Sequence, residues 1–305
     1  MTQITASQVK ELRDRTGAGM SDCKKALEAT SGDLDKAAEK LRMDGAAKAD
    51  KKAGRTAAEG VIGVASDAGA IALVELNSET DFVAKGEDFR GLAKLAAQLA
   101  LKHRPATIEA LVALADGGET LDAKRRNMVA KIGENLTLRR FEIVAAAGGP
   151  LVTYVHPGDK IAVAVAMGKG ELELGRDIAM HIAAMSPRYL DTASVPADVL
   201  ASERKIIEAQ SAEQSEGKPP EIIAKMLDGK VRKFVAEITL LGQPFVKNPD
   251  ETIEKLLKSK GASVARFARF AVGEGIEKKQ TDFASEVDDL LRPSPRDDHP
   301  SPKGN

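Results

Sequence analysis

The feature that most constrains this chain is residues 75–85 (ELNSETDFVAK), where an apolar segment ends in a polar turn. The apolar segment, residues 70–76 (AIALVEL), is typical of a buried or half-buried β-strand. Apolar residues at spacings of three or four then follow and predict a helix over about residues 81–103. The turn is therefore a connection between a strand and a helix, and Ser78 and Thr80 are candidate helix caps.

One large apolar side chain, Phe82, lies within this polar turn. Exposure of apolar surface to water costs about 25 cal/mol per Å², so we expect Phe82 to be covered by the protein's own core or by another protein. A helix start is the simpler interpretation, because Ser78 and Asp81 fit a capping pattern. A cap and a partner contact are compatible, and the residues alone leave both open.

Length and charge limit the classes of protein that fit this sequence. A chain of 305 residues is long for one core and predicts about two or three domains. Lys and Arg number 45 against 46 Asp and Glu, a balance that argues against a dedicated nucleic-acid-binding protein. No segment reaches about 18 consecutive apolar residues, and no signal-peptide pattern is present. We therefore expect a soluble, cytoplasmic protein with no membrane contact.

Residues 1–43 predict a module of three short helices. Thr5 and Gln8 fit a capping box at the first helix, and Asp33 is a candidate cap for the third. The single cysteine, Cys23, excludes an internal disulfide framework and fits a reducing compartment. Because it lies in a helical pattern, a small core residue explains it better than a reactive thiol does.

Two further features of this region concern its surface. Met20 follows a glycine-rich turn, and an internal contact and a partner contact are equally compatible with that position. Residues 44–55 are small, polar and basic, without periodicity, and predict a hydrated linker rather than a nucleic-acid-binding segment.

The core is predicted to contain two halves of similar plan, the first in residues 56–147 and the second in residues 148–195 and 237–272. Each half has a hairpin, then a helix, then much later a strand. The predicted elements of the first half are strands at 61–65, 70–76 and 136–145 and helices at 81–103, 107–114 and 121–132. Those of the second half are strands at 151–156, 160–167 and 263–272 and a helix at 174–185. We expect an α+β fold with two β-β-α…β halves side by side.

An insertion and a C-terminal region complete the predicted organisation. Residues 196–236 hold two helical patterns separated by a breaker at 215–220, which predicts an antiparallel helical hairpin. The apolar stripe of this hairpin packs either on the protein's own core or on a partner. Residues 273–291 form a C-terminal module with a helix at 282–291, and residues 292–305 are predicted to be a disordered tail.

Several kinds of chemistry lack the residues that they need. No G-x-x-x-x-G-K-[ST] segment could hold a nucleotide, and no H-E-x-x-H or paired-cysteine motif offers a metal site. The four histidines are scattered; His181 fits a satisfied core residue, whereas His156, at a strand end, is the better candidate for a partner contact. We therefore expect no catalytic residue, no metal, no cofactor, no small-molecule substrate and no enzymatic activity.

Residues 75–85 and several other phrases resemble elongation factor Ts. The other phrases are LRDRTGAGMSDCKKAL at 12–27, KIGENL at 131–136, DIAMHIAAM at 177–185, QPFVK at 243–247 and VGEGIEK at 272–278. The resemblance covers residues 1 to about 290 in the family's order. It implies that the first module is similar to a ubiquitin-associated domain, and that the inserted hairpin is a coiled coil through which some members self-associate.

The resemblance also implies a function, guanine nucleotide exchange on the translational GTPase elongation factor Tu. Thr80, Asp81, Phe82 and Val83 match the segment that displaces Mg²⁺ from the partner, with Phe82 as a wedge. The implied partner-binding residues are Arg13, Met20, Ile132, Gly133, His156 and Val246. Ser21 and Lys247 depart from the family pattern, in which methionine is common at these two positions.

Two other classes of protein fit the sequence less well. An enzyme would need converging acids or a cofactor cradle, and the sequence has neither. A helical adaptor or a ribosome-associated binding protein would not explain residues 75–85.

Overall fold

The computed structural model describes residues 4–212 and 218–277 of the chain. The chain divides into two compact units, residues 1–274 and residues 275–305. The elements named below belong to the first unit. The predicted helix at 282–291, the predicted tail at 292–305 and part of the predicted breaker at 215–220 lie outside the described residues.

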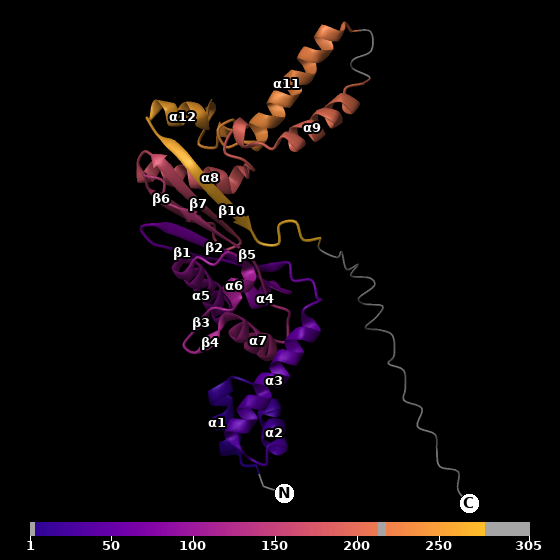
Figure 1. Cartoon of the computed structure of the whole chain (residues 1–305), viewed down its shortest axis with the longest axis vertical. Coiled ribbons are helices and arrows are strands. Elements are labelled where there is room, and N and C mark those ends of the chain that lie inside the picture. The colour runs from indigo at the N-terminus through magenta and orange to yellow at the C-terminus, as the bar shows by residue number, and fades with distance from the viewer. Residues whose placement is uncertain (1–3, 213–217, 278–305) are drawn as a thin grey trace, which may run out of the picture. The chain divides into compact units, whose positions relative to one another are not determined.

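The N-terminal helices are α1 (Ala6–Thr16), α2 (Met20–Ala29) and α3 (Leu34–Lys52), shown in Figure 1. The predicted capping box is confirmed, because the Thr5 N–H donates to Gln8 Oε1 (3.0 Å) and the Gln8 N–H donates to Thr5 Oγ1 (3.3 Å). The caps formed by Asp33 at α3 and the core position of Cys23, which is fully buried, are confirmed as well.

The predicted linker at residues 44–55 is wrong over most of its length, because α3 continues to Lys52. Alanine favours helix, and the small residues of this segment let α3 approach α7 (Leu121–Ile132) closely. A Cβ placed on Gly45 would lie 3.2 Å from the Cβ of Ala130, and Ala49 is buried. Small side chains that look like a hydrated hinge in the sequence are therefore a helix–helix contact.

The first half contains a three-stranded antiparallel sheet and the helices that follow its hairpin. The sheet has the order β1 (Glu59–Ser66), β2 (Ala70–Ser78), β5 (Thr137–Ala145). Between β2 and α7 lie α4 (Asp81–Ala84), α5 (Glu87–His103), α6 (Ile108–Val112), β3 (Ala115–Asp116) and β4 (Glu119–Thr120). The single helix predicted over 81–103 is wrong: Gly86, with extended backbone, separates α4 from α5.

The second half repeats the plan with a sheet of order β10 (Ser263–Ala271), β7 (Ile161–Lys169), β6 (Leu151–Val155). Its helix, α8 (Leu172–Met185), directly follows the hairpin. The short elements β8 (Pro244–Phe245), β9 (Asn248–Thr252) and α12 (Ile253–Ser259) were not predicted. A 3₁₀ turn, η1 (Thr192–Ser194), precedes the insertion.

The two sheets stack face to face, whereas we expected two halves side by side. Ile71 and Leu73 of β2 face a layer that contains the small residues Ala162, Ala164 and Ala166 of β7. The alternate residues of each strand face outward, where α5 covers the first sheet and α8 the second, as Figure 1 shows. Strands β2 and β7 are therefore buried on both faces, which is why their sequences read as nearly continuous apolar segments.

The inserted helices are α9 (Ala197–Gln210) and α11 (Pro220–Ile238), which contact each other. Arg204 Nη2 lies 3.3 Å from Asp228 Oδ1, and Ile207 and Leu227 are buried. Ile206 and Ile222 remain exposed to solvent. Among the described residues, no helix is long and apolar enough to cross a membrane.

A buried carboxylate, that of Glu75 on β2, joins the two halves. It accepts hydrogen bonds from Arg140 Nε (2.5 Å), Arg139 Nη1 (3.2 Å), Asn77 Nδ2 (3.0 Å) and the Gly273 N–H (2.8 Å). Burial alone would raise the pKa of Glu75, but the bonds from Gly273, Arg140 and Asn77 outweigh it and hold the pKa below its usual value. The buried carboxylate of the first half therefore depends on Gly273, which follows the last strand of the second half.

Candidate functional site

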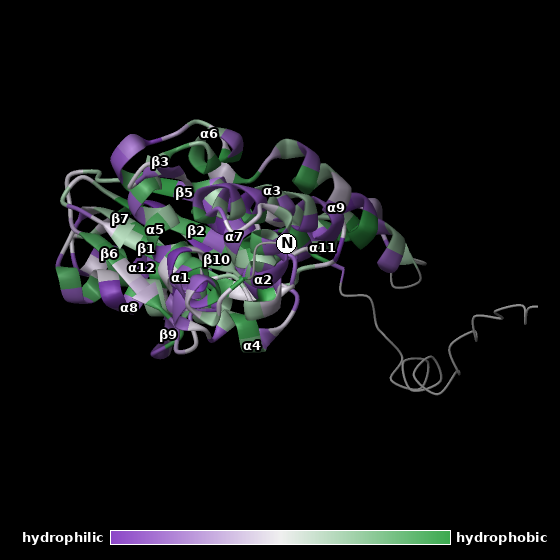
Figure 2. Ribbon diagram, turned by 90° about the horizontal axis from the view of Figure 1, so that it is seen from below, coloured by the Kyte–Doolittle hydropathy of each residue, from purple (hydrophilic) through white to green (hydrophobic). Residues whose placement is uncertain are grey.

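The side chain of Phe82 is 82% exposed. It is the second residue of α4, whose other apolar residues turn inward: Ala84 is buried, and Val83 packs against the core of the first half. Figure 2 shows α4 as a largely hydrophobic turn at the lower edge of the molecule. Of the two interpretations left open by the sequence, a core phenylalanine is excluded.

The cap of α4 is Thr80, whose Oγ1 accepts from the Val83 N–H at 3.5 Å. The alternative cap, Ser78, is wrong, because that residue ends β2 and is buried. The Ser78 hydroxyl instead donates to the Thr80 carbonyl oxygen at 2.8 Å. Thr80 thus accepts two hydrogen bonds, one at its carbonyl oxygen from Ser78 and one at its hydroxyl oxygen from Val83.

A second segment, residues 133–135, braces this turn from the end of α7. Both carboxylate oxygens of Glu134 accept from Thr80, one from its N–H (3.0 Å) and one from its hydroxyl (2.7 Å). In the opposite direction, the Asn135 N–H donates to Glu79 Oε1 at 2.6 Å. Each segment therefore supplies a carboxylate to a backbone N–H of the other.

Asp81 and Lys85 form an ion pair across α4, with 2.6 Å between Lys85 Nζ and Asp81 Oδ2. The hydrogen bond from Lys85 lowers the pKa of Asp81, and the nearby charge of Lys160 lowers it further. Lys85 Nζ also lies 5.7 Å from the centroid of the Phe82 ring. The exposed ring is therefore flanked by a carboxylate that stays ionised near neutral pH.

Two of the candidate partner-binding residues, Ile132 and Gly133, lie beside this turn. Ile132 lines a shallow depression together with Phe82 and Val83. Gly133 ends α7 in the left-handed conformation (φ 86°), and its carbonyl oxygen accepts a hydrogen bond from Lys52 of α3. The structure thus brings together six of the predicted residues: Thr80, Asp81, Phe82, Val83, Ile132 and Gly133.

His156 lies on the turn between β6 and β7, which packs against the first half. The Asp159 carbonyl oxygen of this turn accepts from the Ile62 N–H (2.8 Å), and Lys160 pairs with Glu59 (2.6 Å). His156 itself is exposed, with its Nδ1 3.1 Å from the Tyr154 hydroxyl. Because Lys160 also acts on Asp81, this turn belongs to the surroundings of α4.

Val246 lies beside α8 and is 44% exposed. Its N–H donates to Nδ1 of the buried His181 (3.2 Å), and His181 Nε2 bonds to Gln243 Oε1 (3.0 Å). Both ring nitrogens are thus satisfied by a neutral imidazole, and burial lowers the pKa of His181. The prediction of a satisfied core histidine is confirmed. Lys247, at one of the departures from the family pattern, pairs with Asp177 (2.6 Å).

Arg13 and Met20 lie on the N-terminal helices, away from α4 in the sequence and on different elements. Met20 is 55% exposed as the first residue of α2, so a purely internal contact is excluded. Arg13 is exposed in the last turn of α1. The candidates thus lie on three parts of the first unit: the N-terminal helices, the region of α4, and the loop beside α8.

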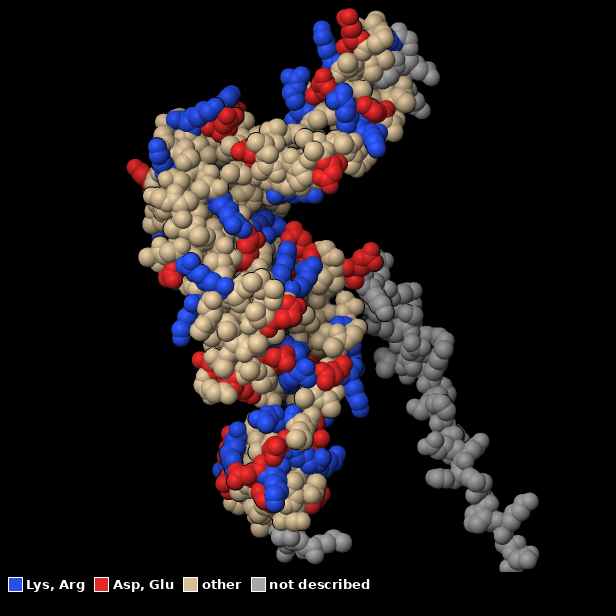
Figure 3. Space-filling view, in the orientation of Figure 1, with Lys and Arg blue, Asp and Glu red and all other residues tan. Residues whose placement is uncertain are grey.

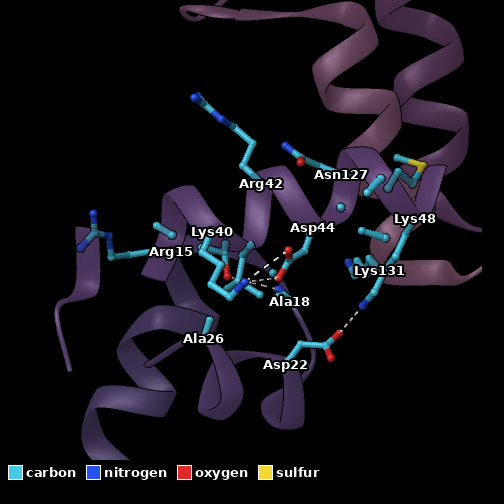
Figure 4. Close-up of a pocket in the computed structure, with 18 of the residues that line it drawn as sticks. Arg15, Ala18, Asp22, Ala26, Lys40, Arg42, Asp44, Lys48, Asn127 and Lys131 are labelled. Carbon is cyan, nitrogen blue, oxygen red and sulfur yellow. Dashed lines mark hydrogen bonds and ion pairs between the residues drawn. The ribbon is translucent and has the colours of Figure 1, made fainter. Parts of the chain in front are cut away.

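A cavity of about 730 Å³ lies between the N-terminal helices and α7. Its lining mixes charges of both signs, and Figure 4 shows Lys40 paired with Asp44 and Lys48 with Asp22. The face of the molecule drawn in Figure 3 likewise intersperses acidic and basic residues. Within the described ranges, no group of three or more His, Cys, Asp or Glu side chains could hold a metal ion.

Three residues of the site, Glu79, Glu134 and Lys160, were not predicted from the sequence. Glu134 is 54 residues from its partner Thr80, so no local spacing connects them. The one feature of the sequence that could have indicated Glu134 is its position directly after Gly133. A glycine at this position ends a helix, so the next residue lies in the loop that leaves it.

Comparison with known proteins gives one consistent result. The family described as "Elongation factor TS" matches residues 79–274. A protein of Methylococcus capsulatus named "Elongation factor Ts" is 55% identical over 294 residues, which cover 95% of this chain and 99% of the relative. Proteins of the same name from Thioalkalivibrio sulfidiphilus and Hydrogenovibrio crunogenus are 54% and 53% identical over 287 residues, which cover 93% of this chain in each case and 97% and 96% of the relatives.

Proposed function

Because this chain belongs to the elongation factor Ts family and so acts in translation elongation, we propose that it is a guanine nucleotide exchange factor for elongation factor Tu. One observation carries the proposal: Phe82, on a turn braced from both sides, is 82% exposed. An isolated exposed apolar residue is ordinary, but a large ring on a restrained turn suits insertion into a partner.

The proposed mechanism is displacement of the Mg²⁺ that supports bound GDP. Mg²⁺ and backbone N–H groups hold the phosphates of a nucleotide in this class of GTPase. Residues 80–83 press against that region, with Phe82 as the wedge, and the weakened shell releases GDP faster. By linkage, GDP and the exchange factor each lower the affinity of the partner for the other.

The remaining proposed contacts lie both beside the wedge and on other parts of the first unit. Ile132, Gly133 and His156 extend the surface around α4, Met20 and Arg13 supply a contact on the N-terminal helices, and Val246 supplies one beside α8. All six are exposed or half-buried in the structure, so they are accessible to a partner without unfolding. No cofactor, nucleic acid or small-molecule substrate enters this mechanism, and the protein works in the cytoplasm.

Self-association through α9 and α11 is a second candidate role. Ile206 and Ile222 are exposed on these helices, at positions where an apolar contact between two hairpins would cover them. Sedimentation of the chain with both residues changed to Ser would test this role separately from exchange.

The substitution Phe82→Ala tests the proposed function. We expect GDP release from elongation factor Tu, measured with a fluorescent GDP analogue at saturating exchange factor, to slow markedly. Binding to nucleotide-free partner should weaken by on the order of 2–4 kcal/mol, as for a buried hot-spot aromatic. Leu172→Ala is the matched control, because it removes an exposed apolar side chain from α8, outside the proposed contacts. Full-rate release by Phe82→Ala with an unchanged melting temperature contradicts the wedge.

A further inference from the structure

The helix that presents Phe82 is too short to hold itself in place. α4 has 4 residues, and isolated helices shorter than about 12 residues are marginal in water. Burial of Ala84 anchors the C-terminal end of α4, but the exposed ring contributes no burial at its N-terminal end. The conformation there depends on hydrogen bonds to other segments.

Those bonds form a continuous path from α7 to the residue next to Phe82. Glu134 accepts from the Thr80 hydroxyl (2.7 Å), and the same oxygen atom of Thr80 accepts from the Val83 N–H (3.5 Å). The second carboxylate oxygen of Glu134 accepts a hydrogen bond from the Thr80 N–H (3.0 Å). A single side chain thus fixes both the backbone and the side chain of Thr80, the residue that caps α4.

The segment that carries Glu134 is itself restrained. Asn135 is buried, its N–H donates to Glu79, and its side-chain amide donates to the Arg55 carbonyl oxygen at 2.7 Å. Arg55 Nη1 lies 3.5 Å from Glu79. Glu134 therefore projects from a fixed backbone and can impose a position on Thr80, rather than follow its motion.

We propose that Glu134 is a positioning residue for nucleotide exchange, which holds the turn of Thr80 so that Phe82 meets the partner in the productive orientation. This inference rests on the proposed function of Phe82. Hydrogen bonds to an ionised carboxylate are stronger than neutral ones, and restraint before binding lowers the entropy lost on binding. Without Glu134 the ring still reaches the partner, but it spends less time in the orientation that disturbs the Mg²⁺ site.

The proposal predicts a larger effect on the maximal rate of GDP release than on affinity. The proposed contacts on α1, α2 and the loop at Val246 do not depend on Glu134 and still bind the partner without it. We expect Glu134→Ala to lower the rate at saturating exchange factor about tenfold, as for loss of a charged hydrogen-bonding group. Glu134→Gln keeps one acceptor oxygen and should recover part of that loss. The matched control is Glu173→Ala, which removes an exposed carboxylate from the first turn of α8.

A double-mutant cycle with Phe82→Ala separates positioning from other effects. If Glu134 acts through Phe82, the double variant releases GDP at the rate of Phe82→Ala alone. Additive losses, or a full rate for Glu134→Ala beside a slow Phe82→Ala, overturn the positioning role and leave the exchange function standing. A full rate for Phe82→Ala overturns the proposed function, and the inference with it.

Melting temperatures of all variants accompany the rates. If Glu134→Ala unfolds at the assay temperature, Thr80→Val replaces it in the same cycle, because this change removes only the hydroxyl that Glu134 and Val83 share. The same non-additivity with Phe82→Ala is expected, and its absence overturns the proposal.

Discussion

The two halves of the core share one plan and differ in the connection between the hairpin and its helix. In the second half, β7 reaches α8 through residues 170 and 171 alone, with Gly170 at φ 121°. In the first half, the same connection is residues 79–86 and contains α4 with Phe82. The scaffold is thus repeated, and the candidate site is an elaboration of one copy.

The second half is elaborated at a different connection, the one that follows its helix. Between α8 and β10 lie α9, α11 and the loop that carries Val246. Each half therefore keeps its sheet and covering helix, but the same connection holds different elements, since α6, β3, β4 and α7 occupy it in the first half. Loops on a rigid sheet change with little cost to the core, so two repeats of one plan can present different surfaces.

The largest expected effect is a difference in the free energy of unfolding between variants at two phenylalanines of the first half. Phe89 of α5 is 1% exposed, whereas Phe82 is 82% exposed. Phe89→Ala should lower the free energy of unfolding by about 3–5 kcal/mol, because it leaves a cavity between α5 and the sheet. Phe82→Ala should leave that free energy unchanged. Urea unfolding followed by circular dichroism measures both, and a comparable loss for the two variants would show that α4 belongs to the core.

A second prediction compares how each half packs its helix. In the first half the close approach is at a strand glycine, where a Cβ on Gly63 would lie 2.1 Å from the backbone oxygen of Ala93. In the second half it is at a helix glycine, where a Cβ on Gly175 would lie 2.7 Å from Cγ2 of Val152. Side chains can move aside more readily than backbone, and alanine is about 1 kcal/mol better than glycine within a helix.

Gly63→Ala should therefore cost about 3 kcal/mol, the upper end of the range for overpacking, and Gly175→Ala about 1 kcal/mol. Thermal unfolding of the two variants tests the order. A larger loss of stability for Gly175→Ala than for Gly63→Ala would show that the Val152 side chain cannot move aside, and would contradict this prediction.

The smallest expected effect concerns pH. The buried imidazole of His181 has a lowered pKa, so the unfolded chain binds a proton near the ordinary value of 6.5 while the folded chain does not. The free energy of unfolding is therefore largest above that pH and falls as pH falls from 6.5 toward the folded pKa. The carboxylates of Asp81 and Glu75 have lowered pKa values and remain ionised in this range.

Urea midpoints at mildly acidic and mildly alkaline pH, for the wild-type chain and for His181→Asn, measure this dependence. The variant should have a lower urea midpoint at both pH values. The difference between its two midpoints should be much smaller than in the wild-type chain. An equal slope in both proteins would assign the acid sensitivity to another group.

The secondary structure was largely predictable where the apolar periodicity ended at a residue that favours a turn or a helix end. Residues 121–132 were predicted as a helix and α7 spans Leu121–Ile132, because an apolar face ends at Gly133. Gly45 misled the prediction of α3, since a glycine that usually ends a helix here allows contact with Ala130. The stacking of the sheets was not predictable, because alternation in β7 shows two buried faces but not what covers them.

The exposed residues of the site were predictable from the sequence, whereas the residues that hydrogen-bond to its turn were not. Thr80 as a cap and Phe82 as the apolar residue of a polar turn follow from local sequence. The role of Glu134 depends on a contact across 54 residues, which no local pattern specifies. The exposure of Phe82 depends on how α4 packs against the core, which local sequence does not specify, so the residues alone left two interpretations.

The carboxylate of Glu75 has a consequence for the order in which the chain can fold. One of its hydrogen bonds comes from Gly273, which lies 198 residues further along the chain. During synthesis β2 emerges early, yet this buried charge lacks one of its donors until nearly all of the second half has left the ribosome. Contacts of such long range slow folding, because their loop-closure entropy is lost before they form. Glu75 therefore reaches its final hydrogen bonding late, and a nascent chain cut short before residue 273 would keep this buried carboxylate without its Gly273 donor.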